Sequence, residues 1–201
     1  MKLRTGTAAA HREAESAAFV KAIFDATVER AQYVRFLEAL KAVYGALEAA
    51  LERHRGDPRL APLALPAVYR SEALAADLAF YGSPARPALE ATGRYVRQLE
   101  QLASAAPHRL VAHAYTRYLG DLSGGQALKK CIQRAFTLEG QSGVAFYEFG
   151  AISDLNAFKG QYRAALDALP LSEAEQGDVV AEAVLAFELN GALTREVSAR
   201  T

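Results

Sequence analysis

Three glycines lie close together in a part of the chain that otherwise consists of helix-forming residues. Gly120, Gly124 and Gly125 fall within YLGDLSGGQALKK, residues 118–130. Each glycine costs a helix about 0.8 to 1 kcal/mol relative to alanine. Gly120 and Gly124 are four residues apart and share one helix face, so the main chain is bare there and a flat group can approach it closely. The alternative is that another helix packs against this face.

Two well-known glycine motifs do not match this segment. A phosphate-binding loop requires Lys followed by Ser or Thr after the second glycine, where this chain has Gln126 and Ala127. A nucleophile elbow requires G-x-S-x-G, and Ser123 is one position out of register in G-D-L-S-G-G. The glycines therefore indicate close approach or bending of the helix rather than either of these chemistries.

A carboxylate and a guanidinium lie beside the glycines. Arg117 and Asp121 are four residues apart, which places them on neighbouring turns of one helix face, and Tyr115 lies on a preceding turn. A carboxylate beside exposed backbone can hold ordered water. The alternative is a surface ion pair, which stabilises a protein by only a few tenths of a kcal/mol.

The chain has four histidines that could bind a metal. His54 at a helix end predicts a solvated residue, and His108 after Pro107 predicts a structural one. His113 is either a ligand or a hydrogen-bonded core residue. His11 differs because alanines surround it, which leaves room for a large planar group. Glu15, one turn further on, could orient its ring, although a lone helical histidine is more often not a ligand.

Composition narrows the class of protein. The 201 residues include 23 basic and 23 acidic side chains, and this balance argues against nucleic-acid binding. The single cysteine, Cys131, excludes an internal disulfide and favours a reducing compartment. No stretch approaches the roughly 20 apolar residues of a membrane span, and the N-terminus lacks a signal-peptide core. The sequence therefore predicts a soluble cytoplasmic protein without a membrane anchor.

Apolar residues recur at helical spacing almost throughout, which predicts an all-α fold and one domain over residues 1–201. Ser172 and Glu175 match a capping box at the start of the last helix, ahead of an apolar series that ends at Phe187. Turns are expected at 55–66, 81–87 and 138–143. The predicted helices are 6–26, 29–54, 66–82, 85–104, 107–137, 153–168 and 172–198.

Taken together, these segments resemble the heme oxygenase family. VAHAYTRYLGDLSGGQALKK, residues 111–130, is similar to the family's signature, and LRTGTAAAHREAE is similar to its first helix. RSEALAADLAFYG, AFYEFGAISDLNAFKGQYRAALDALPL and AFELN follow in the family's order, and FYEF is closer to the soluble bacterial and cyanobacterial branch. The resemblance implies a single multi-helix domain in which haem is sandwiched between a proximal helix and a kinked distal helix.

The resemblance also implies roles for particular residues. His11 would ligate the haem iron with Glu15 behind it, and Asp121 would anchor a distal water network supported by Arg117 and Tyr44. Gly120, Gly124 and Gly125 would cover the other haem face. The remaining residues implied to contact haem, mostly through its propionates, are Arg4, Tyr115, Lys159, Arg163 and Phe187. Ala8 departs from the family, in which many members carry a lysine there, so the propionate clamp is expected to be weaker.

The implied reaction converts haem b, which is both cofactor and substrate, to biliverdin, carbon monoxide and ferrous iron. The expected biliverdin isomer is IXα. The reaction consumes O2 and electrons from a donor such as ferredoxin or a flavin reductase. Glycines would keep side chains away from the distal face, and water held by Asp121 would supply protons. A non-catalytic haem carrier or sensor is the alternative, which the intact Asp121 and glycine series disfavour.

Overall fold

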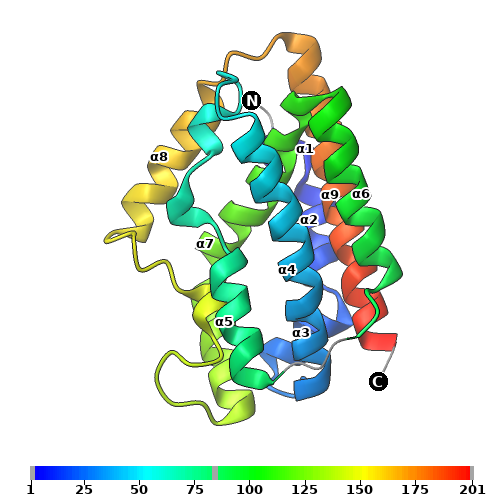
Figure 1. Ribbon diagram of the computed structural model, residues 1–201, viewed down its shortest axis with the longest axis vertical. Coiled ribbons are helices and arrows are strands. Elements are labelled where there is room, and N and C mark those ends of the chain that lie inside the picture. Colours follow the sequence, from blue (N-terminus) through cyan, green and yellow to red (C-terminus); the bar gives the residue numbers. More distant parts are fainter. Residues whose placement is uncertain (1–2, 83–85, 200–201) are drawn as a thin grey trace.

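The protein is a bundle of helices packed around one hydrophobic core, as expected. The computed structural model describes residues 3–82 and 86–199, and no strand occurs in those ranges. The bundle has its long helices roughly side by side, with α8 at its edge (Figure 1). The helices are α1 Leu3–Gly6, α2 Ala8–Glu15, α3 Ala18–Phe24, α4 Arg30–Arg53, α5 Ser71–Tyr81, α6 Glu90–Ala105, α7 Leu110–Phe136, α8 Leu155–Asp167 and α9 Glu173–Ala199, with short 3-10 turns η1 Ala61–Leu63, η2 Pro66–Val68, η3 Pro107–Arg109 and η4 Ala145–Tyr147.

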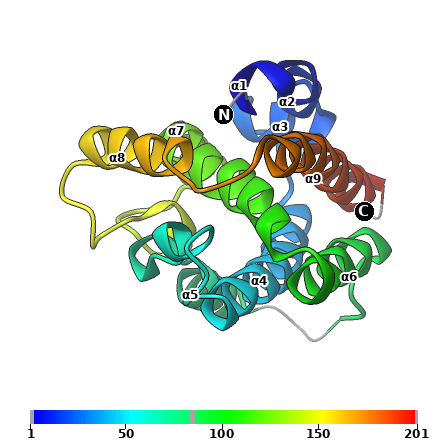
Figure 2. The same ribbon diagram turned by 90° about the horizontal axis from the view of Figure 1, so that it is seen from above.

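The core is organised by α4, which packs against α5, α6, α7 and α9. Its apolar residues recur every three or four positions, so one stripe of the helix is buried. Tyr33, Leu37, Leu40, Tyr44 and Leu47 on this stripe are all fully buried. Seen from above, α4 faces α7 across the middle of the bundle, and α2 and α3 lie on the outer side of α9 (Figure 2). This arrangement brings residues from opposite ends of the chain together.

The first predicted helix, 6–26, is wrong because α1 ends at Gly6 and two short helices, α2 and α3, follow in its place. Ala17 has an extended conformation with ψ 138, which breaks the helix between α2 and α3. The turn lets Phe19 and Ile23 enter the core. At the first break, the hydroxyl of Thr7 donates to the carbonyl of Leu3 at 2.8 Å. Burial of the two apolar side chains outweighs the helix propensity of the alanines.

The predicted helix 66–82 is also interrupted. The chain makes the 3-10 turn η2, becomes extended at Tyr69 with ψ 140, and begins α5 only at Ser71. As a result Arg70 is buried rather than displayed on a helix surface. The helix predicted from residue 85 begins at Glu90, where the carboxylate of Glu196 accepts the backbone N–H of Glu90 at 3.2 Å. Part of the predicted turn 81–87, residues 83–85, lies outside the described residues.

Several helix ends were predicted correctly. The capping box of α9 forms, because the Glu175 carboxylate accepts the Ser172 N–H at 2.9 Å and the Ser172 hydroxyl accepts the Glu175 N–H at 3.3 Å. α4 and α8 begin and end within two residues of the predicted bounds. α7 follows the 3-10 turn at Pro107 and stays α-helical through all its glycines, so the kink remains a prediction. No helix within the described ranges is long and apolar enough to cross a membrane.

Candidate functional site

The glycine face of α7 is open. A Cβ atom built at Gly120 or Gly124 would meet no side chain or neighbouring backbone within 4 Å. The alternative that another helix packs there is therefore wrong. Gly125 faces the other way, where a Cβ would lie 3.4 Å from Cδ1 of Tyr147 in η4. Gly120 and Gly124 thus expose main chain, whereas Gly125 allows Tyr147 to pack closely against the opposite side of the helix.

His11 lies on α2, a short helix that packs mainly against α9 and buries none of its residues. Its Nδ1 is 3.4 Å from Oε2 of Glu15, as the spacing of one turn predicted. The ring also makes an edge contact with Phe187 of α9, with centroids 5.7 Å apart and planes at 74°. Glu15 and Phe187 together hold the imidazole, while Nε2 makes no contact with another polar group in the described part of the chain.

Asp121 belongs to a polar network that joins three helices. The hydroxyl of Tyr44 on α4 donates to Oδ2 of Asp121 and accepts from Nε of Arg117 at 3.1 Å. Arg117 also donates through Nη1 to Oδ1 of Asn190 on α9 at 2.6 Å. Arg117 and Asp121 are therefore joined through the hydroxyl of Tyr44. Because Arg117 is only 8% exposed, this is not the surface pair considered as the alternative.

Burial and charge act on this network in opposite directions. Burial raises the pKa of Asp121 to about 6, although the charge of Arg117, the hydrogen bond from Tyr44 and the charge of Arg70 lower it. Burial also raises the pKa of Tyr44 well above its ordinary value, so its hydroxyl stays protonated and donates. Burial would lower the pKa of Arg117, but the interactions with Tyr44 and Asp121 raise it. Asp121 is therefore the member of this network with a pKa near neutral, whereas Tyr44 stays protonated and Arg117 stays charged.

The residues expected to hold anionic groups lie on three elements. Lys159 and Arg163 are one turn apart on α8, half-buried and exposed respectively, and Arg4 is exposed on α1. None of these cations has a carboxylate partner within residues 3–82 and 86–199. Tyr115 is half-buried on α7, where it packs against the core. α1 is held close to α9, because a Cβ at Gly6 would lie 2.5 Å from Cγ1 of Val180.

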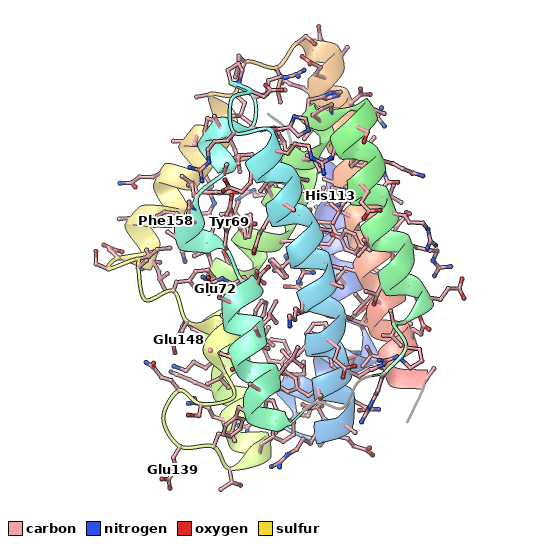
Figure 3. The ribbon with its side chains drawn as sticks, in the orientation of Figure 1. Tyr69, Glu72, His113, Glu139, Glu148 and Phe158 are labelled. Carbon is pink, nitrogen blue, oxygen red and sulfur yellow. The ribbon has the colours of Figure 1, made fainter. Side chains whose placement is uncertain are left out.

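The other histidines have structural contacts. His113 is fully buried, with Nε2 3.1 Å from Oε1 of Glu182 and Nδ1 3.2 Å from the hydroxyl of Tyr95. It lies inside the bundle, behind α4 and α6 (Figure 3). His54 is not simply solvated as predicted, because its Nε2 lies 2.8 Å from the carbonyl oxygen of Ala103. Nε2 of His108 lies 3.2 Å from Oδ2 of Asp178, which agrees with the predicted structural role.

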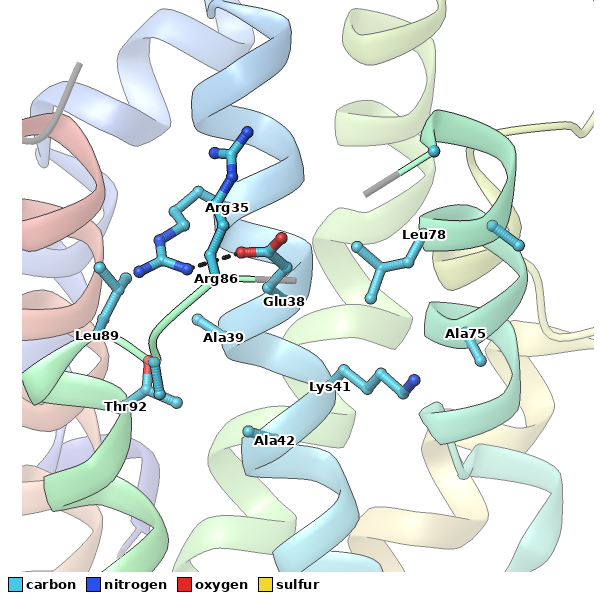
Figure 4. Close-up of a pocket in the computed structure, with 13 residues that line it drawn as sticks. Arg35, Glu38, Ala39, Lys41, Ala42, Ala75, Leu78, Arg86, Leu89 and Thr92 are labelled. Atoms are coloured by element: carbon cyan, nitrogen blue, oxygen red, sulfur yellow. Dashed lines mark hydrogen bonds and ion pairs between the residues drawn. The ribbon is translucent and has the colours of Figure 1, made fainter. Parts of the chain in front are cut away.

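A separate hollow of about 570 Å³ lies between α4, α5 and the start of α6. Its floor is formed by alanine and leucine side chains, and Arg35, Lys41 and Arg86 line it with Glu38, which pairs with Arg35 at 2.8 Å (Figure 4). No residue of the glycine face or of the Asp121 network lines this hollow. It is therefore distinct from the candidate site.

Known proteins resemble this chain in both sequence and fold. The family model described as heme oxygenase matches residues 1–196. The chain belongs to the heme oxygenase family. It is 42% identical to heme oxygenase 1 of Synechocystis over 98% of this chain and 83% of that protein. It is 41% identical to the heme oxygenase of Guillardia theta over 98% of this chain and 85% of that protein.

Solved heme oxygenase structures superimpose closely on the chain. Cyanobacterial heme oxygenase-1 from Synechocystis, crystallised in complex with heme, gives a TM-score of 0.94 at 40% identity and covers 98% of this chain and 91% of that one. The heme oxygenase of Leptospira interrogans gives 0.93 at 41% identity, with 97% of both chains covered. The predicted family and all-α heme oxygenase fold are confirmed.

Sequence reasoning missed two residues that bear on the site. Asn190 was given no role, although it lies three residues after Phe187 and so on the same side of α9. The spacing of three residues from Phe187 was the signal that could have identified it. Arg70 is the first residue of RSEALAADLAFYG, and the helix predicted there gave no sign that it is buried or that its charge lowers the pKa of Asp121.

Proposed function

We propose that this chain is a heme oxygenase that cleaves haem b to biliverdin, carbon monoxide and ferrous iron with O2 and donated electrons. The observation that carries the proposal is the open glycine face of α7 beside the Asp121 network. Haem, when bound, supplies both the iron that activates O2 and the ring that is opened. The full-length match to the heme oxygenase family supports the same activity.

The residues fit such a planar, anionic ligand. Gly120 and Gly124 leave main chain accessible, and His11 has a ring nitrogen without a partner among the described residues. The helix of His11 leaves all its residues at least partly accessible. In this proposal His11 would ligate the iron, and the carboxylate of Glu15 would favour a proton on Nδ1, which would leave Nε2 free to bind metal. The edge of Phe187 limits rotation of the ring.

The propionates of haem require cations. Lys159 and Arg163 on α8 and Arg4 on α1 have no acidic partners in the described chain, so their charges are available for carboxylates. Tyr115 would add a hydroxyl. Ala8 is half-buried on α2 and offers no charge, so fewer contacts fix the rotation of the ring in its plane. We expect the IXα isomer to dominate, with a weaker preference than a charged residue at position 8 would give, because contacts to the propionates would set the orientation of the ring.

Asp121 would control protons without touching the haem itself. Its carboxylate accepts from Tyr44, and the remaining lone pairs can accept from water over the open glycine face. Arg117, which is fixed by Asn190, holds Tyr44 in place through the 3.1 Å hydrogen bond to its hydroxyl. The network therefore orients water at a face from which side chains are absent. This is the role that general acid catalysis would need there.

The electron donor and cellular setting follow from the same proposal. We expect a small reductant such as ferredoxin or a flavin reductase, a cytoplasmic location, and no nucleic-acid partner. We also expect the whole chain, residues 1–201, to act as one domain, since its described buried residues form a single core.

The test is to mix the purified protein with haemin, ferredoxin, ferredoxin reductase and NADPH in air, with catalase present. We expect the Soret band to decline and the broad red absorbance of biliverdin to appear. The same mixture with His11→Ala controls for free haem degradation. An unchanged haem spectrum in the presence of reductant would overturn the enzyme assignment in favour of a haem carrier.

A further inference from the structure

Asp77 on α5 is a buried carboxylate that hydrogen-bonds to the backbone of a distant turn. It is only 1% exposed. Its Oδ1 accepts the N–H of Ala145 at 2.7 Å, and its Oδ2 accepts the N–H of Phe146 at 2.8 Å. No cation pairs with Asp77 within residues 3–82 and 86–199. Both of its oxygens therefore bond to the first two residues of η4, which begins 68 residues further along the chain.

Two neighbouring side chains fix the same turn. Nη1 of Arg70, the residue before α5, donates to the carbonyl of Phe146 at 3.3 Å and to the carbonyl of Glu148. The hydroxyl of Tyr81 at the end of α5 donates to the carbonyl of Gly143 at 2.9 Å. Hydrogen bonds that involve a charged group are stronger than those between neutral groups. The backbone of the turn is thus held to α5 through both its N–H groups and its carbonyls.

The turn η4 also contacts α7, behind the glycine face. Tyr147 is 1% exposed, and its Cδ1 would lie 3.4 Å from a Cβ at Gly125. The carbonyl of Tyr147 accepts from Nε2 of Gln126 at 2.9 Å, and Lys129 pairs with Glu148. Because η4 packs against both α5 and α7, its attachment to α5 decides where these contacts on α7 are made.

The glycine segment of α7 depends on support from this side. Gly120 and Gly124 lower the helix propensity of the segment. A Cβ at either position would meet nothing within 4 Å, so no side chain packs on the open face to stabilise the helix there. The segment is therefore stabilised from its buried side, where Tyr147 packs against Gly125.

The same turn supports the hydrogen-bond donor of Asp121. The ring of Phe146 packs edge-on against the ring of Tyr44, with centroids 5.7 Å apart and planes at 68°. Tyr44 also contacts the ring of Tyr118, at 6.0 Å between centroids, and its hydroxyl donates to Asp121. Of these two ring contacts, the one with Phe146 depends on Asp77, because the backbone N–H of Phe146 is bonded to that carboxylate.

We propose that Asp77 is a positioning residue for the Asp121 network. It fixes η4, and η4 in turn supports both the glycine segment of α7 and the ring of Tyr44. The open face can then stay bare while the helix beneath it remains closed. This support is a property of the haem-free chain and can be measured there, whereas its consequence for turnover rests on the proposed function.

The test is hydrogen exchange of the haem-free protein, measured by mass spectrometry for the parent and Asp77→Asn. Asparagine keeps one oxygen but places an NH2 group against a backbone N–H, so one bond to η4 is lost. Amides within residues 118–130 should then exchange roughly 5-fold to 30-fold faster, because the turn no longer holds the segment closed. Parent exchange rates there in folded Asp77→Asn would overturn the proposal.

Glu196→Gln is the matched control. The Glu196 carboxylate accepts the backbone N–H groups of Glu90 at 3.2 Å and Ala91 at 2.8 Å, so it fixes the start of α6 as Asp77 fixes η4. Its replacement removes a comparable bond from a different element, and exchange within residues 118–130 should keep the parent rate. Equal acceleration in both variants would mean a general loss of stability and would contradict the proposed role of Asp77.

Gln126→Met covers the case in which Asp77→Asn does not fold. Gln126 is exposed on α7, and methionine has a similar helix propensity. The variant therefore loses mainly the 2.9 Å hydrogen bond to the carbonyl of Tyr147. The amides of residues 118–130 should exchange roughly 2-fold to 10-fold faster, because the lost bond joins neutral groups. Unchanged exchange in this variant would be equally decisive against the proposal.

In an active enzyme, haem affinity and turnover should respond differently to Asp77→Asn. The variant changes no group proposed to hold haem, so the Kd from a Soret titration should stay near the parent value. Biliverdin formation should slow roughly 10-fold to 100-fold, because the hydroxyl of Tyr44 is no longer held at Asp121. Glu196→Gln should match the parent in both measurements. A parent rate of biliverdin formation in Asp77→Asn would reject the positioning role.

The exchange measurement separates this proposal from the proposed function. Faster exchange in Asp77→Asn of a chain that makes no biliverdin would leave the support by η4 standing and reject the proposed function. Biliverdin formation by the parent, with unchanged exchange in Asp77→Asn, would do the reverse.

Discussion

Replacing Gly124 by Ala should stabilise the haem-free protein while it weakens haem binding. The new methyl group meets nothing within 4 Å, so no packing cost opposes the gain in helix propensity. That gain is about 0.8 to 1 kcal/mol. For a chain of this size it corresponds to a rise in Tm of about 2 to 4 °C. Glycine at this position is therefore suboptimal for stability, and some other requirement must keep the backbone bare.

That requirement is tested by haem affinity. If the ring lies against this face, a methyl group at position 124 overpacks the contact at a cost of about 1 to 3 kcal/mol. Haem binding should then weaken roughly 5-fold to 150-fold. Calorimetry of the haem-free protein gives the Tm, and titration of the Soret band gives the Kd. For Gly124→Ala both the Tm of the haem-free protein and the Kd for haem should rise, because the protein becomes more stable while haem binds more weakly.

The matched control is Gly125→Ala on the same helix. Its methyl group would contact Cδ1 of Tyr147 at 3.4 Å, away from the open face, so haem affinity should change little and the stability gain should be smaller. A lower Tm for haem-free Gly124→Ala would refute the conclusion that this face is open. An unchanged haem Kd would show that the ring binds elsewhere.

Three other perturbations probe the site and its support. His11→Ala should change the axial ligation of bound haem, seen as a shifted Soret band that added imidazole restores; an unchanged spectrum would assign the iron to another ligand. Asp121→Asn should bind haem normally but form little biliverdin, and the parent activity should fall as the pH drops through about 6, where the carboxylate becomes protonated and loses acceptor capacity. An activity that is flat from pH 5 to 7 in both proteins would argue against this role. Gly6→Ala should destabilise the haem-free protein by about 1 to 3 kcal/mol, measured by urea unfolding, because its methyl group would lie 2.5 Å from Val180.

Local sequence signals located most of the helices. The capping box at Ser172 and Glu175 depends on residues three apart, so it is visible in the sequence and forms as expected. The break at Ala17 has no such signal, because alanines favour helix on both sides. It arises where Phe19 and Ile23 find a core made by distant helices, which single-sequence propensity does not contain.

The site was predictable to the extent that its residues are close in sequence. The contact of His11 with Glu15 follows from one helical turn. The link between Arg117 and Asp121 does not, because the hydroxyl that joins them belongs to Tyr44, more than 70 residues away. Arg70 was hidden for a similar reason, since the extended Tyr69 that turns it inward sits between two segments that both look helical.

The helix α2 lies on the surface of the bundle, and this affects how a ligand could reach His11. No side chain from Ala8 to Glu15 is deeply enclosed, and the short helix rests mainly on α9. Its amide hydrogens should therefore exchange with solvent through local opening of the helix. Exchange should be far faster than in α4, where it requires the core to unfold. A ligand held by this helix would slow that exchange in proportion to its affinity. If haem binds at this helix as proposed, α2 can open to admit the ring while the rest of the bundle stays folded.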